Sequence, residues 1–179
     1  MSNIKLNLDK VNKAKILAKK KATESLWRRG SFVKMVLNEY QQGMMDSFDA
    51  SESIMYFLLC SRRIGKTWVL STAALRQCFM YPGSRVLYLS TTTEQVTEIC
   101  DQTFNPILET CPDDLRPEHK KKYNKYVFSN GSEIRIKGLD KVGPDILRGV
   151  KAHLVIFDEA CFMKGVQSII NSVIMPMVI

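Results

Sequence analysis

The sequence has few of the residues that mark a metal-binding, secreted or membrane-spanning protein. Its 179 residues include only two histidines, His119 and His153, and both lie far from any cysteine pair, so a structural zinc site is not expected. The five cysteines are odd in number and none has Cys-x-x-Cys spacing, which indicates buried thiols in a reducing compartment. There is no apolar run of about 18 residues and no signal peptide, so we expect neither secretion nor a membrane partner.

The positive charge of the chain is concentrated near its N-terminus. The formal net charge is +8, and residues 1–30 hold nine lysines and arginines against two acidic residues. Apolar residues are sparse there, so we predict a basic helical arm over 1–30, followed by one main domain over 31–179. Such an arm is typical of a segment that contacts DNA phosphates or the acidic surface of a neighbouring subunit, and equally of a solvated extension.

The most informative motif has the pattern of a phosphate-binding loop. It follows the apolar run 54–59, which we predict to be a buried strand, and it precedes an apolar-rich helix. Gly65 lets the main chain approach a phosphate, Lys66 reaches the β- and γ-phosphates, and the Thr67 hydroxyl is a ligand for Mg²⁺. The motif has cysteine in place of the first glycine of the Walker A pattern and reads Cys60-Ser61-Arg62-Arg63-Ile64-Gly65-Lys66-Thr67.

A second motif, of Walker B type, lies about ninety residues downstream. Its apolar run 154–157 is rich in β-branched and aromatic residues, which predicts a strand buried on both faces of a parallel sheet. Asp158 would hold Mg²⁺ directly or through a water, and Glu159 would orient and deprotonate the attacking water. The two motifs together predict ATP and Mg²⁺ as cofactors and hydrolysis as the reaction.

The remaining elements alternate between helices and strands. We predict a helix over 33–45, a buried strand over 85–90, a helix over 92–108 that Pro106 kinks or splits, a polar connection over 111–122, a hairpin of 125–128 with 133–137, and a glycine-rich loop over 138–149. This order predicts an α/β fold, a RecA-like P-loop NTPase with a mostly parallel sheet flanked by helices and a β-hairpin insertion. The site is expected at the carboxyl ends of the parallel strands.

At this point the chain resembles a known family, the large subunits of viral terminases, which are the ATPases that pump DNA into the procapsids of tailed phages and herpesviruses. The resemblance is to their N-terminal ATPase domain and covers residues 31–179. It rests first on the deviant phosphate loop and on Asp158-Glu159-Ala160 with Phe162 nearby. Weaker similarities are Glu39-Tyr40-Gln41-Gln42, Leu147-Arg148-Gly149 and Ile174-Met175-Pro176-Met177.

The resemblance implies roles for individual residues. Tyr40 and Gln41 match the element that contacts adenine, and an arginine of the loop acts on the γ-phosphate, Arg62 being the better match and Arg63 the alternative. The predicted catalytic residues are therefore Glu159, Lys66 and Arg62, and the predicted metal ligands are Thr67 and Asp158. The predicted nucleotide-binding residues are Tyr40, Gln41, Ser61, Arg62, Arg63, Ile64, Gly65, Lys66, Thr67 and Trp68.

The resemblance also implies partners and a place in the cell. Such a motor works as a homo-oligomeric ring on the portal of an empty procapsid, with double-stranded DNA and a small terminase subunit as partners. It acts in the host cytoplasm for a phage and in the host nucleus for a herpesvirus-like virus, and we favour a phage.

Two other functions remain open from the sequence. A superfamily-two helicase-like DNA translocase shares the glutamine element, the phosphate loop and the Asp-Glu strand. The other open function is that of an assembly module that binds a nucleotide without hydrolysing it. Only three parallel strands can be identified before Ile179. We therefore expect a sheet that is truncated at the C-terminus, without a nuclease domain, and weak or absent hydrolysis by this chain alone.

Overall fold

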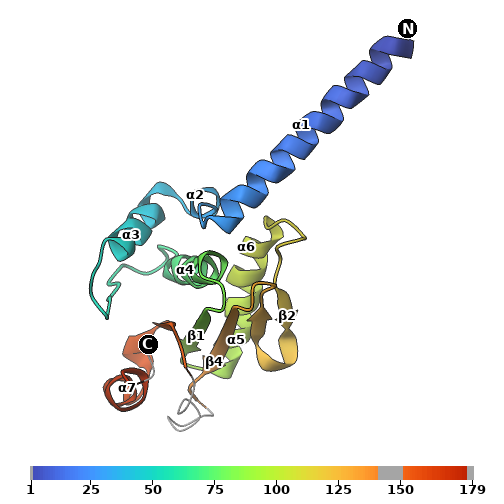
Figure 1. Ribbon diagram of the computed structural model, residues 1–179. Helices are drawn as coiled ribbons and strands as arrows, with labels where there is room; N and C mark the ends of the chain where they lie inside the picture. The colour runs from blue at the N-terminus through green and yellow to red at the C-terminus, as the bar shows by residue number, and fades with distance from the viewer. Residues whose placement is uncertain (1, 141–150, 177–179) are drawn as a thin grey trace.

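A computed structural model describes residues 2–140 and 151–176 of the chain. It begins with one long helix, α1 (Ser2–Arg28), which projects away from the other elements and has the N-terminus at its far end (Figure 1). The later helical elements are α2 (Val33–Val36), α3 (Glu39–Asp49), α4 (Lys66–Met80), α5 (Thr93–Ile99), the π-helical turn η1 (Cys100–Phe104), α6 (Asn105–Glu109), the 3₁₀ turns η2 (Lys121–Tyr123) and η4 (Ala160–Phe162), α7 (Val166–Ile169) and the π-helical turn η5 (Ile170–Ile174).

The described strands form one mixed sheet in the order β2-β3-β4-β1-β5. Its members are β1 (Arg85–Ser90), β2 (Glu118–Lys120), β3 (Lys125–Val127), β4 (Glu133–Gly138) and β5 (Leu154–Phe157). Strand β1 pairs in parallel with both β4 and β5, whereas β3 is antiparallel to β2 and β4. The carboxyl ends of β1 and β5 are therefore neighbours, with Leu89 in register with Phe157.

Side chains alternate across β1 and build a core on each face of the sheet. Val86 and Tyr88 pack with residues of α4, α5, η1 and α6 on one face. Leu87 and Leu89 pack on the other face with residues from the C-terminal segment, including Met163 and others of α7 and η5. Because helical elements cover both faces, the central strand is buried after its first residue, Arg85, as the apolar sequence of 85–90 predicts.

The base of α1 is anchored by aromatic packing. Trp27 stacks on Phe32 with ring centroids 4.0 Å apart, and Phe79 of α4 meets both rings edge-on. Among the described residues, no helix combines the length and the apolar character needed to cross a membrane.

The predicted buried strand over 54–59 is wrong. These residues form an irregular segment between α3 and α4, with Ile54 81%, Phe57 72% and Leu59 96% exposed. A strand is stable only when its backbone groups pair with a neighbour. The two neighbours of β1 in the described sheet are β4 and β5, and 54–59 is not a member of that sheet.

Two predicted helices are broken. The helix expected over 33–45 stops at Val36, and α3 starts afresh because the Asn38 side chain accepts a hydrogen bond from the Gln41 amide and caps it. Tyr40 and Gln41 consequently lie in the first turn of α3 and not in later turns. The helix expected over 92–108 is capped by Thr92 and is split ahead of Pro106 by the π-helical turn η1, as the proline predicts.

The predicted hairpin is present, since β3 and β4 pair around residues 129–132. It is not an insertion at the edge, however, because β4 lies in the middle of the sheet and buries Ile134 and Ile136. Strand β2 falls in the stretch predicted to be a polar connection. Strand β5 is the last strand of the described sheet and its side chains are only half-buried apart from Ile156, so burial on both faces was overpredicted. Most of the expected loop 138–149 lies outside the described residues.

Candidate nucleotide-binding site

The phosphate loop leads directly into the N-terminus of α4. Gly65 precedes the first helical residue with φ +84°, a left-handed conformation that suits glycine. The ammonium group of Lys66 donates a hydrogen bond to the Ser61 carbonyl at 3.0 Å, so the lysine side chain lies back over the loop. Free backbone N–H groups at the start of α4 add positive potential at the same place. This arrangement suits a polyphosphate.

Helix α3 is tied to the loop by Gln41, which is buried. Its side-chain oxygen accepts a hydrogen bond from the Asn38 backbone at 3.1 Å, and its side-chain nitrogen donates one to the Ile64 carbonyl at 3.2 Å. A Cβ atom on Gly65 would overlap this nitrogen, so a larger residue there would displace the Gln41 side chain from the loop. Gln41 therefore has a structural contact with the loop, and its contact with adenine stays a prediction.

The other predicted nucleotide-binding residues lie around the same loop. Trp68 is half-buried and donates from its indole nitrogen to the Val36 carbonyl at 2.8 Å, which joins α4 to α2. Arg62 and Arg63 are exposed, as is Tyr40. Arg63 has φ +65°, which costs a residue with a Cβ free energy and recurs at functional sites.

The two predicted carboxylates follow β5 at the carboxyl end of the sheet. Asp158 is only 4% exposed, its backbone N–H donates to the Leu89 carbonyl at 2.9 Å, and its Oδ2 accepts a hydrogen bond from the Tyr88 hydroxyl at 3.0 Å. Burial, with the adjacent Asp158 carboxylate second, raises the pKa of Tyr88 well above its ordinary value. The tyrosine therefore keeps its proton and donates a hydrogen bond to Asp158.

Glu159 is exposed and has φ +57°, again in the left-handed region. Its Oε2 accepts a hydrogen bond from the Gln95 side-chain nitrogen at 3.2 Å. The Gln95 oxygen in turn accepts from Ser90 at 2.9 Å and from Thr91. The polar run that ends β1 thus orients the predicted catalytic carboxylate.

Neither Tyr88 nor Gln95 was among the residues expected from sequence. A signal for Gln95 exists in the run Ser90-Thr91-Thr92-Thr93, because polar residues after a buried parallel strand lie at the site edge of the sheet. Tyr88 lies inside an apolar strand and looks like an ordinary core residue.

The predicted metal ligands suit a hard cation. Thr67 lies in the first turn of α4, Asp158 follows β5, and α4 contacts β5. A hydroxyl and a carboxylate are oxygen donors of the kind that Mg²⁺ prefers, and Mg²⁺ typically takes its other ligands from phosphates and waters. Within 2–140 and 151–176 there is no group of three or more histidine, cysteine or acidic side chains that could hold a metal alone. The donor set therefore fits a metal that arrives with a nucleotide.

Comparison with known proteins identifies the family. A model of the terminase large subunit, T4likevirus-type, N-terminal family matches residues 57–171, which is more than half of the chain. The chain belongs to this family. Arg148, which the weaker sequence similarities included, lies outside the described residues of this terminase chain.

Solved structures show the same fold. The chain is similar to the large terminase ATPase domain of Thermus phage P74-26, with a TM-score of 0.63 and 21% identity, over 82% of this chain and 63% of that one. An arginine-to-alanine mutant of the same phage domain matches with a TM-score of 0.64, at the same identity and coverage. The expected RecA-like α/β fold of a terminase ATPase domain is thereby confirmed. No curated protein sequence matches the chain.

Proposed function

We propose that this chain is the ATP-hydrolysing motor domain of a large terminase and that it powers the packaging of double-stranded viral DNA into procapsids. One observation carries the proposal. The chain belongs to the large-terminase N-terminal family, and helix α4, which begins at the phosphate loop, contacts β5, the strand that the two carboxylates follow. The family match favours this function over that of a superfamily-two helicase.

Each predicted residue has a part in the reaction. The backbone N–H groups of 61–65 and the Lys66 ammonium bind the phosphates, and Arg62, or alternatively Arg63, neutralises charge on the γ-phosphate. Thr67 and Asp158 hold Mg²⁺, which when bound offsets the negative charge that develops on the phosphate oxygens. Glu159 accepts a proton from the attacking water, and Gln95 keeps its carboxylate turned toward the site.

The partners follow from the same proposal. Double-stranded DNA is the polymer that is moved, and the ring of subunits, the portal of the procapsid and the small terminase subunit complete the machine. Lys13, Lys15 and Lys21 of the projecting helix α1 are exposed, which supports a contact with DNA phosphates. We place the reaction in the host cytoplasm, where a phage packages its DNA.

A nucleotide-binding module without turnover is a second candidate. The observation that favours it is the segment 54–59, which leads into the phosphate loop and yet lies outside the sheet. A loop whose leading segment is not held in the sheet is expected to place a γ-phosphate less accurately, and catalysis is more sensitive than binding to such misplacement.

Steady-state ATP hydrolysis with Mg²⁺ tests the proposal. We expect turnover by the wild-type chain, an increase with double-stranded DNA, and loss of turnover in Lys66→Ala and in Glu159→Gln. Matched controls are Lys34→Ala and Glu109→Gln, which change exposed residues of α2 and α6 that have no contact with the site residues and should leave turnover intact. ATP binding without turnover would favour the second candidate. Failure of the wild-type chain to bind ATP would contradict both.

A further inference from the structure

The hydroxyl of Tyr88 lies in the core beside Asp158, one of the two predicted carboxylates of the candidate site. Tyr88 is fully buried on β1, and its hydroxyl donates to Asp158 Oδ2 at 3.0 Å. The buried Ser71 of α4, one turn after Thr67, forms a separate hydrogen bond with Thr103 at 2.8 Å, so Tyr88 is linked to the candidate site by the hydrogen bond of its hydroxyl to Asp158.

We propose that Tyr88 is a positioning residue that holds Asp158 in the orientation needed to share a Mg²⁺–nucleotide complex with Thr67. The inference rests on the proposed function, because it concerns how the same site binds its ligand. It adds a residue that touches neither nucleotide nor metal and acts only through Asp158.

The geometry leaves Asp158 little freedom. Its backbone is fixed to β1 by the bond to the Leu89 carbonyl, and its side chain is fixed to β1 by Tyr88. When one carboxylate oxygen accepts the hydrogen bond from the tyrosine, the direction of the second oxygen is set by the rigid carboxylate plane. A buried carboxylate without its donor is costly, so it would move toward water or another partner. Both movements would displace a metal ligand.

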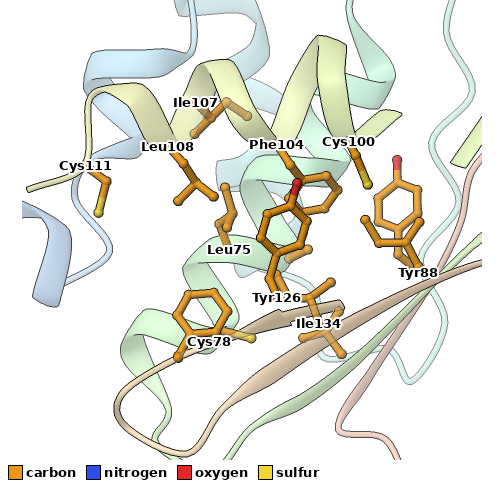
Figure 2. Close-up of a cluster of buried hydrophobic side chains, with 14 of the residues drawn as sticks. Leu75, Cys78, Tyr88, Cys100, Phe104, Ile107, Leu108, Cys111, Tyr126 and Ile134 are labelled. Atoms are coloured by element: carbon orange, nitrogen blue, oxygen red, sulfur yellow. The ribbon is translucent and has the colours of Figure 1, made fainter. Parts of the chain in front are cut away.

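Tyr126 provides a matched control in the same core. It is fully buried like Tyr88, and both rings pack against Phe104, as Figure 2 shows. The Tyr126 hydroxyl donates to the Asn105 side chain at 2.8 Å and not to a residue of the candidate site. Tyr88→Phe and Tyr126→Phe therefore remove the same atom from the same cluster, and only the first removes a donor from Asp158.

The experiment measures the binding of a fluorescent ATP analogue to the full chain as Mg²⁺ is titrated, and again in EDTA. Loss of a side chain that orients a metal ligand typically weakens metal affinity about 10-fold or more. We expect Tyr88→Phe to raise the half-saturating Mg²⁺ concentration by about that factor, with affinity in EDTA unchanged. Tyr126→Phe should behave as the wild type in both conditions. Circular dichroism of both variants establishes that they fold.

A double variant tests whether Tyr88 acts through Asp158. In the Asp158→Asn background, adding Tyr88→Phe should change the affinity for the ATP analogue in saturating Mg²⁺ no further, because the residue that it orients is already altered. Equal Mg²⁺ dependence in Tyr88→Phe and Tyr126→Phe, alongside Mg²⁺-dependent binding by the wild type, would overturn the inference and leave the proposed function standing. A wild-type chain that binds no nucleotide would instead overturn the proposed function, and the inference with it.

Discussion

The two halves of the candidate site differ in how the fold holds them. On the carboxylate half, Asp158 follows a strand of the sheet and is bound by Tyr88 from the core, and Glu159 is bound by Gln95. On the phosphate-loop half, the residues from 54 to 63 are mostly exposed, and the loop is tied to its surroundings by the side chain of Gln41. Asp158 is therefore held by strand pairing and a core hydrogen bond, whereas the loop is held by the Gln41 hydrogen bond and by the packing of the partly buried Leu58, Cys60 and Ile64.

This difference assigns separate tasks to the two halves. The carboxylate half is preorganised, which is what the binding of a metal and the orientation of a water require. The loop half has room to adjust to a phosphate. It also exposes Ile54, Phe57 and Leu59, and each large apolar side chain left in water forgoes about 1.5–3 kcal/mol of burial free energy. The stability of the chain therefore comes from the sheet and α4.

The largest expected effect contrasts two leucines. Leu75→Ala removes a completely buried side chain of α4 and should lower the free energy of unfolding by about 2–5 kcal/mol. Leu59→Ala changes a side chain that is 96% exposed and should alter it by less than about 0.5 kcal/mol. Urea denaturation followed by circular dichroism measures both. Equal losses would mean that 54–59 is packed in solution, and the comparison would fail.

A smaller effect is expected from two glycines. Gly65→Ala places a Cβ at φ +84° against the Gln41 amide, so it should cost at least about 1 kcal/mol of stability and weaken ATP binding. Gly43→Ala, in the exposed part of α3 with open space around it, should instead add about 0.5–1 kcal/mol. Thermal unfolding with and without ATP separates these results. If Gly65→Ala bound ATP as tightly as the wild type, the contact between Gln41 and the loop would not contribute to nucleotide binding.

The smallest effect concerns an ion pair of the sheet. Burial alone would raise the pKa of Glu133, but Lys125 and Arg135 outweigh it and hold that pKa below its ordinary value. A lowered carboxyl pKa stabilises the fold above about pH 4.5, and the contribution disappears as the pH falls through the folded-state pKa.

Glu133→Gln should accordingly lose less than about 1 kcal/mol at pH 7, since solvent screens the pair, and a smaller amount at pH 3, because the contribution falls away below about pH 4.5. Glu52→Gln, in the exposed segment before the loop, is the control and should show no such pH dependence. Denaturation curves at both pH values provide the measurement. A loss for Glu133→Gln that is as large at pH 3 as at pH 7 would point to packing and not to charge.

Sequence reasoning succeeded where local chemistry decides the structure. Thr92 caps α5, Pro106 follows a break, the Asn-Gly turn closes the hairpin, and the apolar run of β1 is buried. The phosphate loop and the Asp-Glu pair can be recognised from sequence because their residues are close together in the chain, and their roles in binding and hydrolysis stay predictions.

Prediction from the sequence failed where contacts between distant segments decide the structure. The run 54–59 has the composition of a buried strand, but pairing depends on a neighbour that its own residues do not specify. The break at Asn38 and the central position of β4 likewise depend on contacts with distant segments. Tyr88 and Gln95 were missed because their roles arise only when β1 and β5 lie side by side.

The central claim is that the two halves bind one ligand, and isothermal titration of ATP in Mg²⁺ and in EDTA tests it most directly. We predict that Lys66→Ala loses binding in both conditions, whereas Asp158→Asn keeps the binding seen in EDTA and loses only the additional affinity that Mg²⁺ gives. Asp158→Asn binding as tightly as the wild type in Mg²⁺ would contradict the account, because the carboxylates would then take no part in the site of the phosphate loop.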